Sequence, residues 1–562
     1  MKGRATPDLR ARWTYLGLSV LVAVLWFATL PLRPLFNPDE GRYAEIPREM
    51  LAAGDWVIPH LNGLAYIEKP PLQYWATAAA LAVFGHGEFA ARFYTACCAL
   101  ATLGVVWLVA WTLWQTAAAW RAAAVLSSML LFVVLGQLLT LDMSLTFYMT
   151  FSLAGFLLAQ QATRGSDAVA PSPSSSRALQ RRWMLIAWAA AALGVLTKGP
   201  VAAAIPAAVL VLYSAYSWDF SPWRRLHAAL GLPVFLAIAV PWHWIAALRM
   251  PGFVQFFFVH EHLSRYLTPS ADRQEAWWFF VAVFALGSIP WTLPALRVVA
   301  VGWRRRVPRG QFDPVLFLWI WVVFICLFFS LSDSKLIPYI LPAMPALALL
   351  VAASPAAAGR RDVWVTALLT LVAAVAAGAA SLFGPRLLAA TDRNHYFALV
   401  ARPLAEIAAL LAVSGLFVLL ERRRDSTRAA VFLGAGWCLA GLLLMRAAGA
   451  VAPLYSGAAL AHALGAVPPE VPVYSIGLYD QTLPFYWRHT FKLVAYRGEL
   501  DFGLRLAPES ELPSVAEFVD EWRRLPDGYA VMETSMFDDL EGEGVPMREI
   551  ARDVHRVLVA RK

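Results

Sequence analysis

Residues 37–43 read NPDEGRY and bring two adjacent carboxylates, a guanidinium and a phenol together in one short stretch. The stretch follows closely on a long apolar run, residues 13–32. Charge at the end of a membrane span is costly unless it is paired or has a chemical task. These side chains could bind and activate a polar substrate. The alternative is a solvated turn, in which Pro38 begins a helix and Asp39 or Glu40 lies in its first turn.

A second group follows in the same loop, where residues 66–72 read YIEKPPL and place Tyr66, Glu68 and Lys69 before a Pro-Pro turn. Further candidates lie singly at the ends of other apolar runs: Asp142, Lys198, Arg265, Lys335 and Tyr339. Several of them also have a purely structural interpretation. Asp142 could cap a helix, Lys198 could extend its ammonium to the membrane surface, and Asp333 with Lys335 could form a weak surface ion pair.

The elements that position these residues are membrane helices. The chain has 562 residues, of which 59% are hydrophobic and 15% charged, and its mean hydropathy is +0.57. A soluble protein of this length would carry far more charge. We therefore expect a mostly α-helical polytopic membrane protein with about 13 transmembrane helices. The predicted spans are 13–32, 92–116, 119–138, 143–162, 183–197, 200–217, 226–248, 277–298, 313–331, 336–354, 363–384, 402–420 and 428–450. The shorter run 71–84 is expected at the interface or as a re-entrant segment.

Arginines set the orientation, because positive charge accumulates in cytoplasmic loops. They cluster after every second predicted span, as at residues 304–309 and 422–428. The candidate residues lie in the alternate loops, above all 33–91 and 249–276. We thus predict a cytoplasmic N-terminus and a periplasmic or lumenal site. The formal net charge of +9 is a topology signal, and no nucleic-acid partner is expected. All four cysteines fall in apolar runs, so no disulfide framework or CxxC metal site is predicted.

The composition turns polar after residue 455, which predicts a transmembrane domain over 1–455 and a small soluble α/β domain over 456–562. Strands are expected near 471–476, 492–496 and 529–532, and helices near 514–525 and 535–540. An odd number of spans places this domain on the outer side. It has no P-loop and no GxGxxG, so a nucleotide-driven role has no support.

A transporter more often buries its charges at the bilayer midplane between broken helices. Here the middle of most runs is Leu, Val, Ala and Phe. This favours a surface site that serves a lipid-borne substrate entering from the side of the membrane.

The motifs Asp39-Glu40-Gly41-Arg42-Tyr43 and 66–72, with the spans and the outer C-terminal domain, resemble the bacterial lipid A aminoarabinose transferases. That family belongs with the protein O-mannosyltransferases among the C-type glycosyltransferases, which use polyprenyl-phosphate sugars. The resemblance implies an inner-membrane enzyme with its active site and C-terminal domain in the periplasm. The implied donor is undecaprenyl phosphate carrying 4-amino-4-deoxy-L-arabinose, and the acceptor is a lipid A phosphate. The implied outcome is resistance to polymyxin and other cationic peptides.

The family is inverting, so a single displacement at the anomeric carbon is implied. The leaving phosphate needs cations, for which Arg42, Lys69, Lys198 and Arg265 are candidates. The acceptor phosphate is already ionised, so a general base is less necessary. The resemblance makes Asp39 the leading catalytic candidate, with Glu40 and Asp142 beside it. The remaining predicted substrate-binding residues are Tyr43, Tyr66, Glu68, Lys335 and Tyr339.

A metal site is a further hypothesis. His260 and His262 alternate and would share one face of an extended chain, and with Glu68 they could bind zinc. The resemblance implies no required cofactor. We expect a monomer that contacts membrane lipid and its two lipid substrates. The rival enzyme is a protein O-mannosyltransferase or another polyprenyl-phosphate-sugar glycosyltransferase, and the rival of another class is a polyprenyl-lipid flippase.

Overall fold

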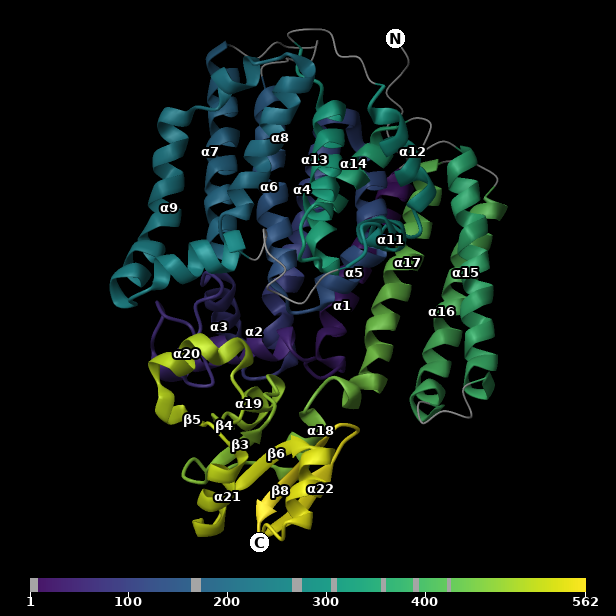
Figure 1. The fold of residues 1–562 in the computed structure, drawn as a ribbon. Helices are drawn as coiled ribbons and strands as arrows, with labels where there is room; N and C mark the ends of the chain where they lie inside the picture. Colours follow the sequence, from purple (N-terminus) through teal and green to yellow (C-terminus); the bar gives the residue numbers. More distant parts are fainter. Residues whose placement is uncertain are drawn as a thin grey trace. The chain divides into compact units, whose positions relative to one another are not determined.

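The computed structural model describes residues 9–162, 173–264, 275–304, 311–354, 360–387, 394–421 and 426–562. These residues divide into two compact units (Figure 1). Unit 1 contains residues 1–29 and 95–445, and unit 2 contains residues 30–94 and 446–562. Unit 2 thus joins the first loop to the C-terminal segment across the sequence.

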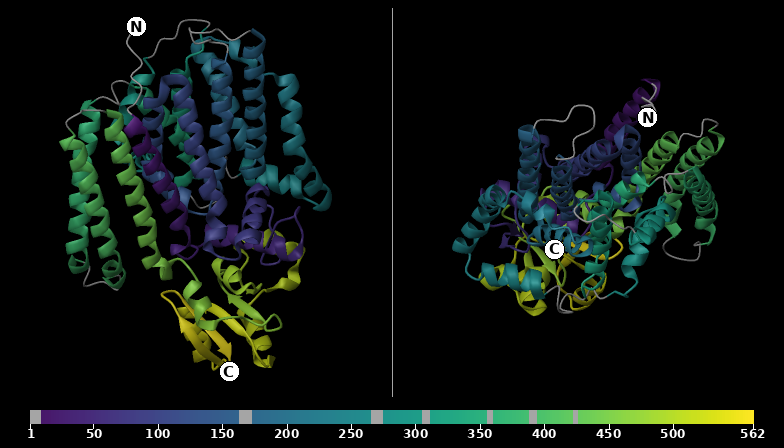
Figure 2. Two further views of the ribbon diagram at one scale, coloured as in Figure 1. Left: turned by 180° about the vertical axis from the view of Figure 1, so that it is seen from behind. Right: turned by 90° about the horizontal axis from the view of Figure 1, so that it is seen from above.

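Unit 1 is helical. Its elements are α1 (Leu9–Ala28), most of α4 (Glu88–Ser128), α5 (Leu130–Gln137), α6 (Leu141–Gln161), α7 (Pro173–Lys198), α8 (Val201–Ser217), η2 (Ser221–Arg225), α9 (Ala228–Arg249), η3 (Gln255–Ser264), α11 (Phe279–Gly287), α12 (Thr292–Gly302), α13 (Pro314–Ser330), η4 (Ile337–Ala343), α14 (Met344–Ala353), α15 (Arg360–Leu387), α16 (Asn394–Leu420) and most of α17 (Ser426–Ala448). Neighbours in sequence pack together, as α6 does with α7 and α15 with α16 (Figure 2).

Within the described ranges, seven helices are long and apolar enough to cross a membrane, and five shorter apolar helices accompany them. The protein is therefore a polytopic membrane protein, as the sequence predicts. The predicted break between the second and third spans is confirmed, because α4 is interrupted at Gln115, whose φ is 75°. The single span predicted over 277–298 is wrong. The chain turns between Gly287 and Thr292, where Pro290 cannot continue the hydrogen-bond ladder of a helix.

The segment that carries His260 also differs from its prediction. It is the π-helical η3, not an extended chain. Residues two apart on a helix do not face each other, so the alternation of His260 and His262 does not place them on one face.

Unit 2 contains η1 (Leu30–Leu32), α2 (Asp39–Ala53), β1 (His60–Leu61), β2 (Leu64–Ala65), α3 (Leu72–Phe84), η5 (Gly449–Leu454), α18 (Ala458–Leu464), β3 (Val473–Ile476), α19 (Thr482–Trp487), β4 (Lys492–Val494), η6 (Gly498–Leu500), α20 (Asp501–Leu506), η7 (Pro508–Ser510), β5 (Glu511–Leu512), α21 (Val515–Arg524), β6 (Tyr529–Glu533), α22 (Thr534–Gly542), β7 (Met547–Arg552) and β8 (Arg556–Arg561). The strands and helices expected in the C-terminal segment are all present, so its α/β class is confirmed.

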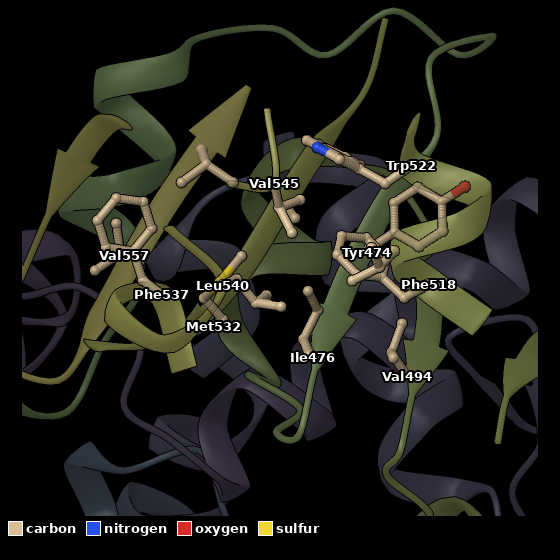
Figure 3. Close-up of a cluster of buried hydrophobic side chains, with 13 residues drawn as sticks. Tyr474, Ile476, Val494, Phe518, Trp522, Met532, Phe537, Leu540, Val545 and Val557 are labelled. Atoms are coloured by element: carbon tan, nitrogen blue, oxygen red, sulfur yellow. The ribbon is translucent and has the colours of Figure 1, made fainter. Parts of the chain in front are cut away.

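Six strands form one sheet in the order β5-β4-β3-β6-β8-β7. The first four are parallel, and β8 and β7 add antiparallel at one side. Helices α21 and α22 contribute Phe518, Trp522, Phe537 and Leu540 to a buried cluster with β3, β4, β6 and β8 (Figure 3). The C-terminal segment therefore has a hydrophobic core of its own, which makes it a firm support for the loops that contact it.

Candidate active site

Helix α2 presents the first motif. Pro38 is its N-cap and makes no side-chain capping bond, and Asp39 and Glu40 both lie in the first turn, as the alternative interpretation predicts. Asp39 is the first helical residue, where the helix dipole favours a carboxylate. Its side chain is 50% exposed, and among the described residues its ion-pair partner is Arg42, at 3.2 Å. This carboxylate is available to a ligand.

Glu40 has a different environment, since it is 2% exposed. One carboxylate oxygen lies 2.6 Å from Arg33 and the other 2.7 Å from Arg92, and Arg92 also donates to the carbonyl oxygens of Leu30 and Pro34. Burial alone would raise the pKa of Glu40, but the two guanidinium groups outweigh it and hold the pKa below its usual range. The oxygens of Glu40 hold the loop to the start of α4, and its part in the chemistry stays a prediction.

Arg42 is held on several sides. Its guanidinium carbon lies 5.8 Å from the ring centre of Tyr43 and 5.9 Å from that of Tyr66, which are cation–π distances. Its second terminal nitrogen forms an ion pair with Glu499. Burial raises the pKa of both phenols, so Tyr43 and Tyr66 stay protonated as hydrogen-bond donors. The structure thus brings two predicted residues, Tyr43 and Tyr66, against a third, the fixed cation Arg42.

Glu499 is the residue that sequence reasoning missed. It lies in η6, and its carboxylate accepts hydrogen bonds from the Gln481 amide at 2.7 Å and from the Tyr66 hydroxyl at 3.4 Å in addition to the Arg42 ion pair. Burial raises the pKa of Glu499, and the charge of Arg42 offsets part of that rise. The C-terminal segment therefore contributes a carboxylate to the motif of the first loop.

A glycine and an asparagine side chain attach the motif to the C-terminal segment. A Cβ on Gly41 would lie 2.5 Å from the carbonyl carbon of Gln481, so only glycine permits this approach. Asn37 donates to Asp480 at 2.8 Å and accepts from the backbone N–H of Thr482 at 3.2 Å. The residues before and after Asp39 are thus fixed by α19 and the turn that precedes it.

Glu68 and Lys69 lie in the turn before α3. The ammonium of Lys69 donates to the carbonyl oxygen of Glu68 at 3.0 Å and lies 4.0 Å from its carboxylate. Both side chains are partly exposed, at 16% for Lys69 and 14% for Glu68. Lys69 therefore keeps a surface that a ligand can reach.

Unit 1 carries a second group. Lys198, the last residue of α7, places its ammonium 2.5 Å from the Asp142 carboxylate and 5.2 Å from the ring centre of Tyr339. Thr140 holds the N-cap position of α6 without a side-chain capping bond, and Asp142 lies in the first turn, so the interpretation of Asp142 as the N-cap is wrong. Lys198 is paired and is not simply extended to the surface. In the described ranges no ion pair joins Asp333 to Lys335, so that interpretation also fails.

The remaining predictions stay untested. Arg265 lies outside the described residues. His260 lies 3.5 Å from Glu261, whereas Glu68 belongs to unit 2. Among the described side chains, no three His, Cys, Asp or Glu residues come together as a metal site, and the His262 side chain lies outside them. The zinc hypothesis therefore remains a prediction.

Together these features give two sets of donors that suit an anionic group: Arg42 with two buried phenols and Lys69 in unit 2, and Lys198 with Tyr339 in unit 1. Each cation has a carboxylate that holds it in place. Fixed cations beside an exposed carboxylate can stabilise a leaving phosphate while the carboxylate orients or stabilises an electropositive partner.

Two family models match the chain. The model described as dolichyl-phosphate-mannose-protein mannosyltransferase matches residues 11–257. The model described as aminoarabinose transferase C-terminal domain matches residues 460–561. The two matches cover the membrane part that carries the first motifs and the segment that carries Glu499.

Curated relatives that match about 60% of this chain are also aminoarabinose transferases by name. The undecaprenyl phosphate-alpha-4-amino-4-deoxy-L-arabinose arabinosyl transferase 1 of Sodalis glossinidius is 37% identical over 351 residues, 61% of this chain and 59% of that protein. The corresponding transferase of Aeromonas salmonicida is 36% identical over 340 residues, 59% of this chain and 58% of that protein. The matched region is thus less than two thirds of the length of these relatives. The crystal structure of ArnT from Cupriavidus metallidurans bound to undecaprenyl phosphate has 34% identity and a TM-score of 0.86, and the match covers 98% of both chains.

Proposed function

Since this chain belongs to the family of bacterial aminoarabinose transferases, we propose that it transfers 4-amino-4-deoxy-L-arabinose from undecaprenyl phosphate to lipid A phosphate groups. The observation that carries the proposal is a likeness over almost the full length of both chains to an ArnT bound to undecaprenyl phosphate. The group around Arg42 supports it, because a buried guanidinium flanked by phenols and an available Asp39 suits a phosphate-linked sugar.

The transfer is a single displacement. An oxygen of the lipid A phosphate forms a bond to the anomeric carbon, the bond from that carbon to the donor's phosphate oxygen breaks, and undecaprenyl phosphate leaves with the electron pair. In unit 2, Arg42 and Lys69 neutralise the charge that grows on the departing phosphate. Lys198 of unit 1 and Arg265, which lies outside the described residues, stay predicted phosphate-binding residues. The acceptor oxygen carries no proton at neutral pH, so the step needs no general base.

Asp39 acts on the sugar. It stabilises positive charge that develops at the anomeric carbon or binds the amino group, for which its half-exposed carboxylate is suited. Asp142 positions Lys198 through their close ion pair. Tyr43, Tyr66, Glu68, Lys335 and Tyr339 complete the substrate-binding surface, and Glu40 holds the loop.

The orientation is part of the proposal. The site and the C-terminal domain, residues 456–562, lie on the periplasmic side of the inner membrane. The arginine distribution supports this, since Arg304 and Arg361 flank loops opposite to those that carry the candidate residues. A cysteine introduced on the exposed surface of the C-terminal domain should react with an impermeant thiol reagent when only the outer membrane is permeabilised. Labelling that requires rupture of the inner membrane would overturn the orientation.

Mass spectrometry of lipid A tests the function. Cells that lack the arabinosyl transferase should gain an aminopentose on lipid A when this chain is expressed, and should become more resistant to polymyxin. The purified protein should release undecaprenyl phosphate from the donor. Unmodified lipid A, with the protein present in the membrane and the donor supplied, would refute the proposal.

The mannosyltransferase model matched over residues 11–257 makes a protein O-mannosyltransferase the second candidate. A mannosyltransferase would transfer mannose from a polyprenyl phosphate to a peptide hydroxyl. The proposed arabinosyl transferase would not use this donor and acceptor. A flippase would move the lipid-linked sugar without releasing polyprenyl phosphate. One assay of product release with both donors therefore separates the three.

A further inference from the structure

A cavity of about 540 Å³ lies within unit 2, at the far end of α2 from Asp39. Its walls come from the last turns of α2, from the hairpin β1–β2, from residues 467–469 and from the loop between α19 and β4. Glu49 lies ten residues beyond Asp39 on the same helix, about 15 Å along its axis. None of the predicted substrate-binding residues lines this cavity, so it is separate from the site described above.

Glu49 lines the cavity and has a buried polar atom without a hydrogen-bond partner among the described residues. The residue is 6% exposed, and one carboxylate oxygen accepts a hydrogen bond from the Gly63 N–H at 2.9 Å. The other oxygen is buried and has no hydrogen-bond partner in the described parts of the chain, although Arg48 lies 4.0 Å away. A buried polar atom without a partner costs free energy, so a ligand group that pairs with it would be stabilised.

The remaining polar lining consists of donors. Arg488, His60 and His489 line the cavity, and within the described ranges neither the guanidinium of Arg488 nor the ring of His60 has a hydrogen-bond or ion-pair partner. Arg48 is held by two hydrogen bonds to Glu45, at 2.6 and 2.7 Å. Burial lowers the pKa of nearby His86, and the positive charges of Arg488 and Arg48 lower it further.

The walls are fixed before any ligand binds. Asn62 and Gly63 both have positive φ, at 59° and 72°, which closes the hairpin β1–β2 in a tight turn. The Asn62 side chain then donates to the Phe491 carbonyl and accepts from the Phe491 N–H, at 2.8 and 2.6 Å. Arg488 holds a left-handed conformation with φ 55° at the end of α19. Such backbone conformations are uncommon outside glycine and cluster at ligand sites.

We propose that this cavity binds a phosphate group, with Arg488, His60 and the free oxygen of Glu49 as the groups that contact it. A neutral carboxyl can donate a proton to an anionic oxygen, and Glu49 is suited to this because burial and then the charge of Glu45 raise its pKa to about 8. The competing ligand chemistry is an ammonium, which would need an ionised Glu49 and would meet the uncompensated charge of Arg488. The source of the phosphate is a lipid headgroup or the free anion, and both present the same oxygens.

Titration of the purified full-length protein in detergent tests the site, with inorganic phosphate and dihexanoyl phosphatidic acid as probes and ethanolamine as the ammonium probe. Arg488→Ala and His60→Ala should each weaken phosphate binding about tenfold or more, because each removes a charge-assisted hydrogen bond. Arg505→Ala is the matched control. Arg505 is an exposed arginine of the same domain that pairs with Asp501, and its loss should leave the affinity unchanged. Binding of both phosphate probes assigns the site to the phosphate itself, and binding of the lipid alone assigns it to a headgroup.

The pH dependence gives a readout that lost folding would not imitate. Affinity should fall as pH rises through about 8 in the unmodified protein, whereas Glu49→Gln keeps a donor at every pH and should lose that fall. The charged and titratable groups around Glu49 are Glu45, Arg48, His60, Arg488 and His489, with Tyr479. They are present in both proteins, so their titration and that of the probe cancel in the comparison. The proposal is overturned if neither phosphate probe binds saturably, if Arg488→Ala binds as tightly as the control, or if ethanolamine is the ligand that binds.

Discussion

The ion pair between Glu499 and Arg42 connects the C-terminal segment to the proposed active site, and Glu499→Gln tests whether it matters for activity. The substitution preserves the shape of the side chain and its bond to Gln481 but removes the negative charge that faces Arg42. Glu499 and Arg42 are 14% and 12% exposed, so solvent screens their interaction only weakly. We expect Arg42 to lose its fixed position, and the transfer of aminoarabinose to slow.

The magnitude follows from what remains. A hydrogen bond to a charged group contributes about 1.5–3 kcal/mol. Arg42 still has Asp39 at 3.2 Å and the faces of Tyr43 and Tyr66, so the larger cost of a buried charge left alone, about 3–5 kcal/mol, does not apply in full. A loss of about 1.5–3 kcal/mol lowers kcat/KM by about 10- to 150-fold.

The assay is the release of undecaprenyl phosphate by purified variants whose yield and thermal unfolding match those of the unmodified protein. Glu549→Gln is the matched control, because Glu549 and Arg552 form an exposed ion pair in the same domain, each 39% exposed. Exposed ion pairs contribute little because solvent screens them, so this variant should keep full activity.

A double-mutant cycle identifies the route by which Glu499 acts. If it works through Arg42, Glu499→Gln should have little further effect once Arg42→Ala is present. The pKa of Glu499 is raised by burial, so protonation should remove its charge, and with it activity, at a higher pH than for an exposed glutamate. This acid limb should be absent from Glu499→Gln. Additive losses in the cycle, or an unchanged acid limb, would refute the reasoning.

Four further outcomes are expected. Lys69→Ala should lower turnover about 10²- to 10³-fold, and Lys69→Arg should recover part of it because the charge is kept without the geometry; equal loss in both would point to a structural role. Asp39→Asn should be nearly as inactive as Asp39→Ala in the lipid A assay, and a fully active Asn variant would show that the negative charge is not used. Gly41→Ala should lower the unfolding temperature and the activity together, because its methyl group meets the Gln481 backbone; normal stability would contradict that contact. The pKa of Glu49 is raised, so its contribution to stability is present below the unfolded-state pKa of about 4.3 and is lost as pH rises to about 8; Glu49→Gln should therefore unfold at a higher temperature than the unmodified protein above that pH, and parallel curves would be inconsistent with a buried neutral carboxyl.

Local patterns predicted much of this fold. The apolar runs mark the helices because a membrane span needs a continuous apolar stretch, and the β-branched residues of β3 and β6 mark buried parallel strands. Strands β5, β7 and β8 were not predicted. The sequence of β7, MREIAR, mixes charged and apolar residues without a period of two, at the edge of the sheet. The break between α11 and α12 had a signal in Pro290, but an apolar run on both sides concealed it.

The site could be predicted only where its residues share a motif. Asp39 and Glu40 are adjacent and chemically alike, so the sequence treats them as equals. The structure separates them through Arg33 and Arg92, which bury one carboxylate and leave the other half exposed. Nothing in the local sequence of the loop indicates that Arg92, at the start of the next long helix, is the partner.

The position of Glu499 has the same cause on a longer scale. Its ion-pair partner, Arg42, lies in the first loop, and no spacing rule links a loop near the N-terminus to a short turn in the last hundred residues. The link depends on Gly41, where the absence of a side chain lets the backbone of Gln481 approach α2. A glycine inside a charged motif, here Gly41, therefore indicates close packing at that position, which is where the Gln481 backbone contacts the motif. If Arg42 binds substrate as proposed, a mutation in the C-terminal segment should change activity through the position of this arginine.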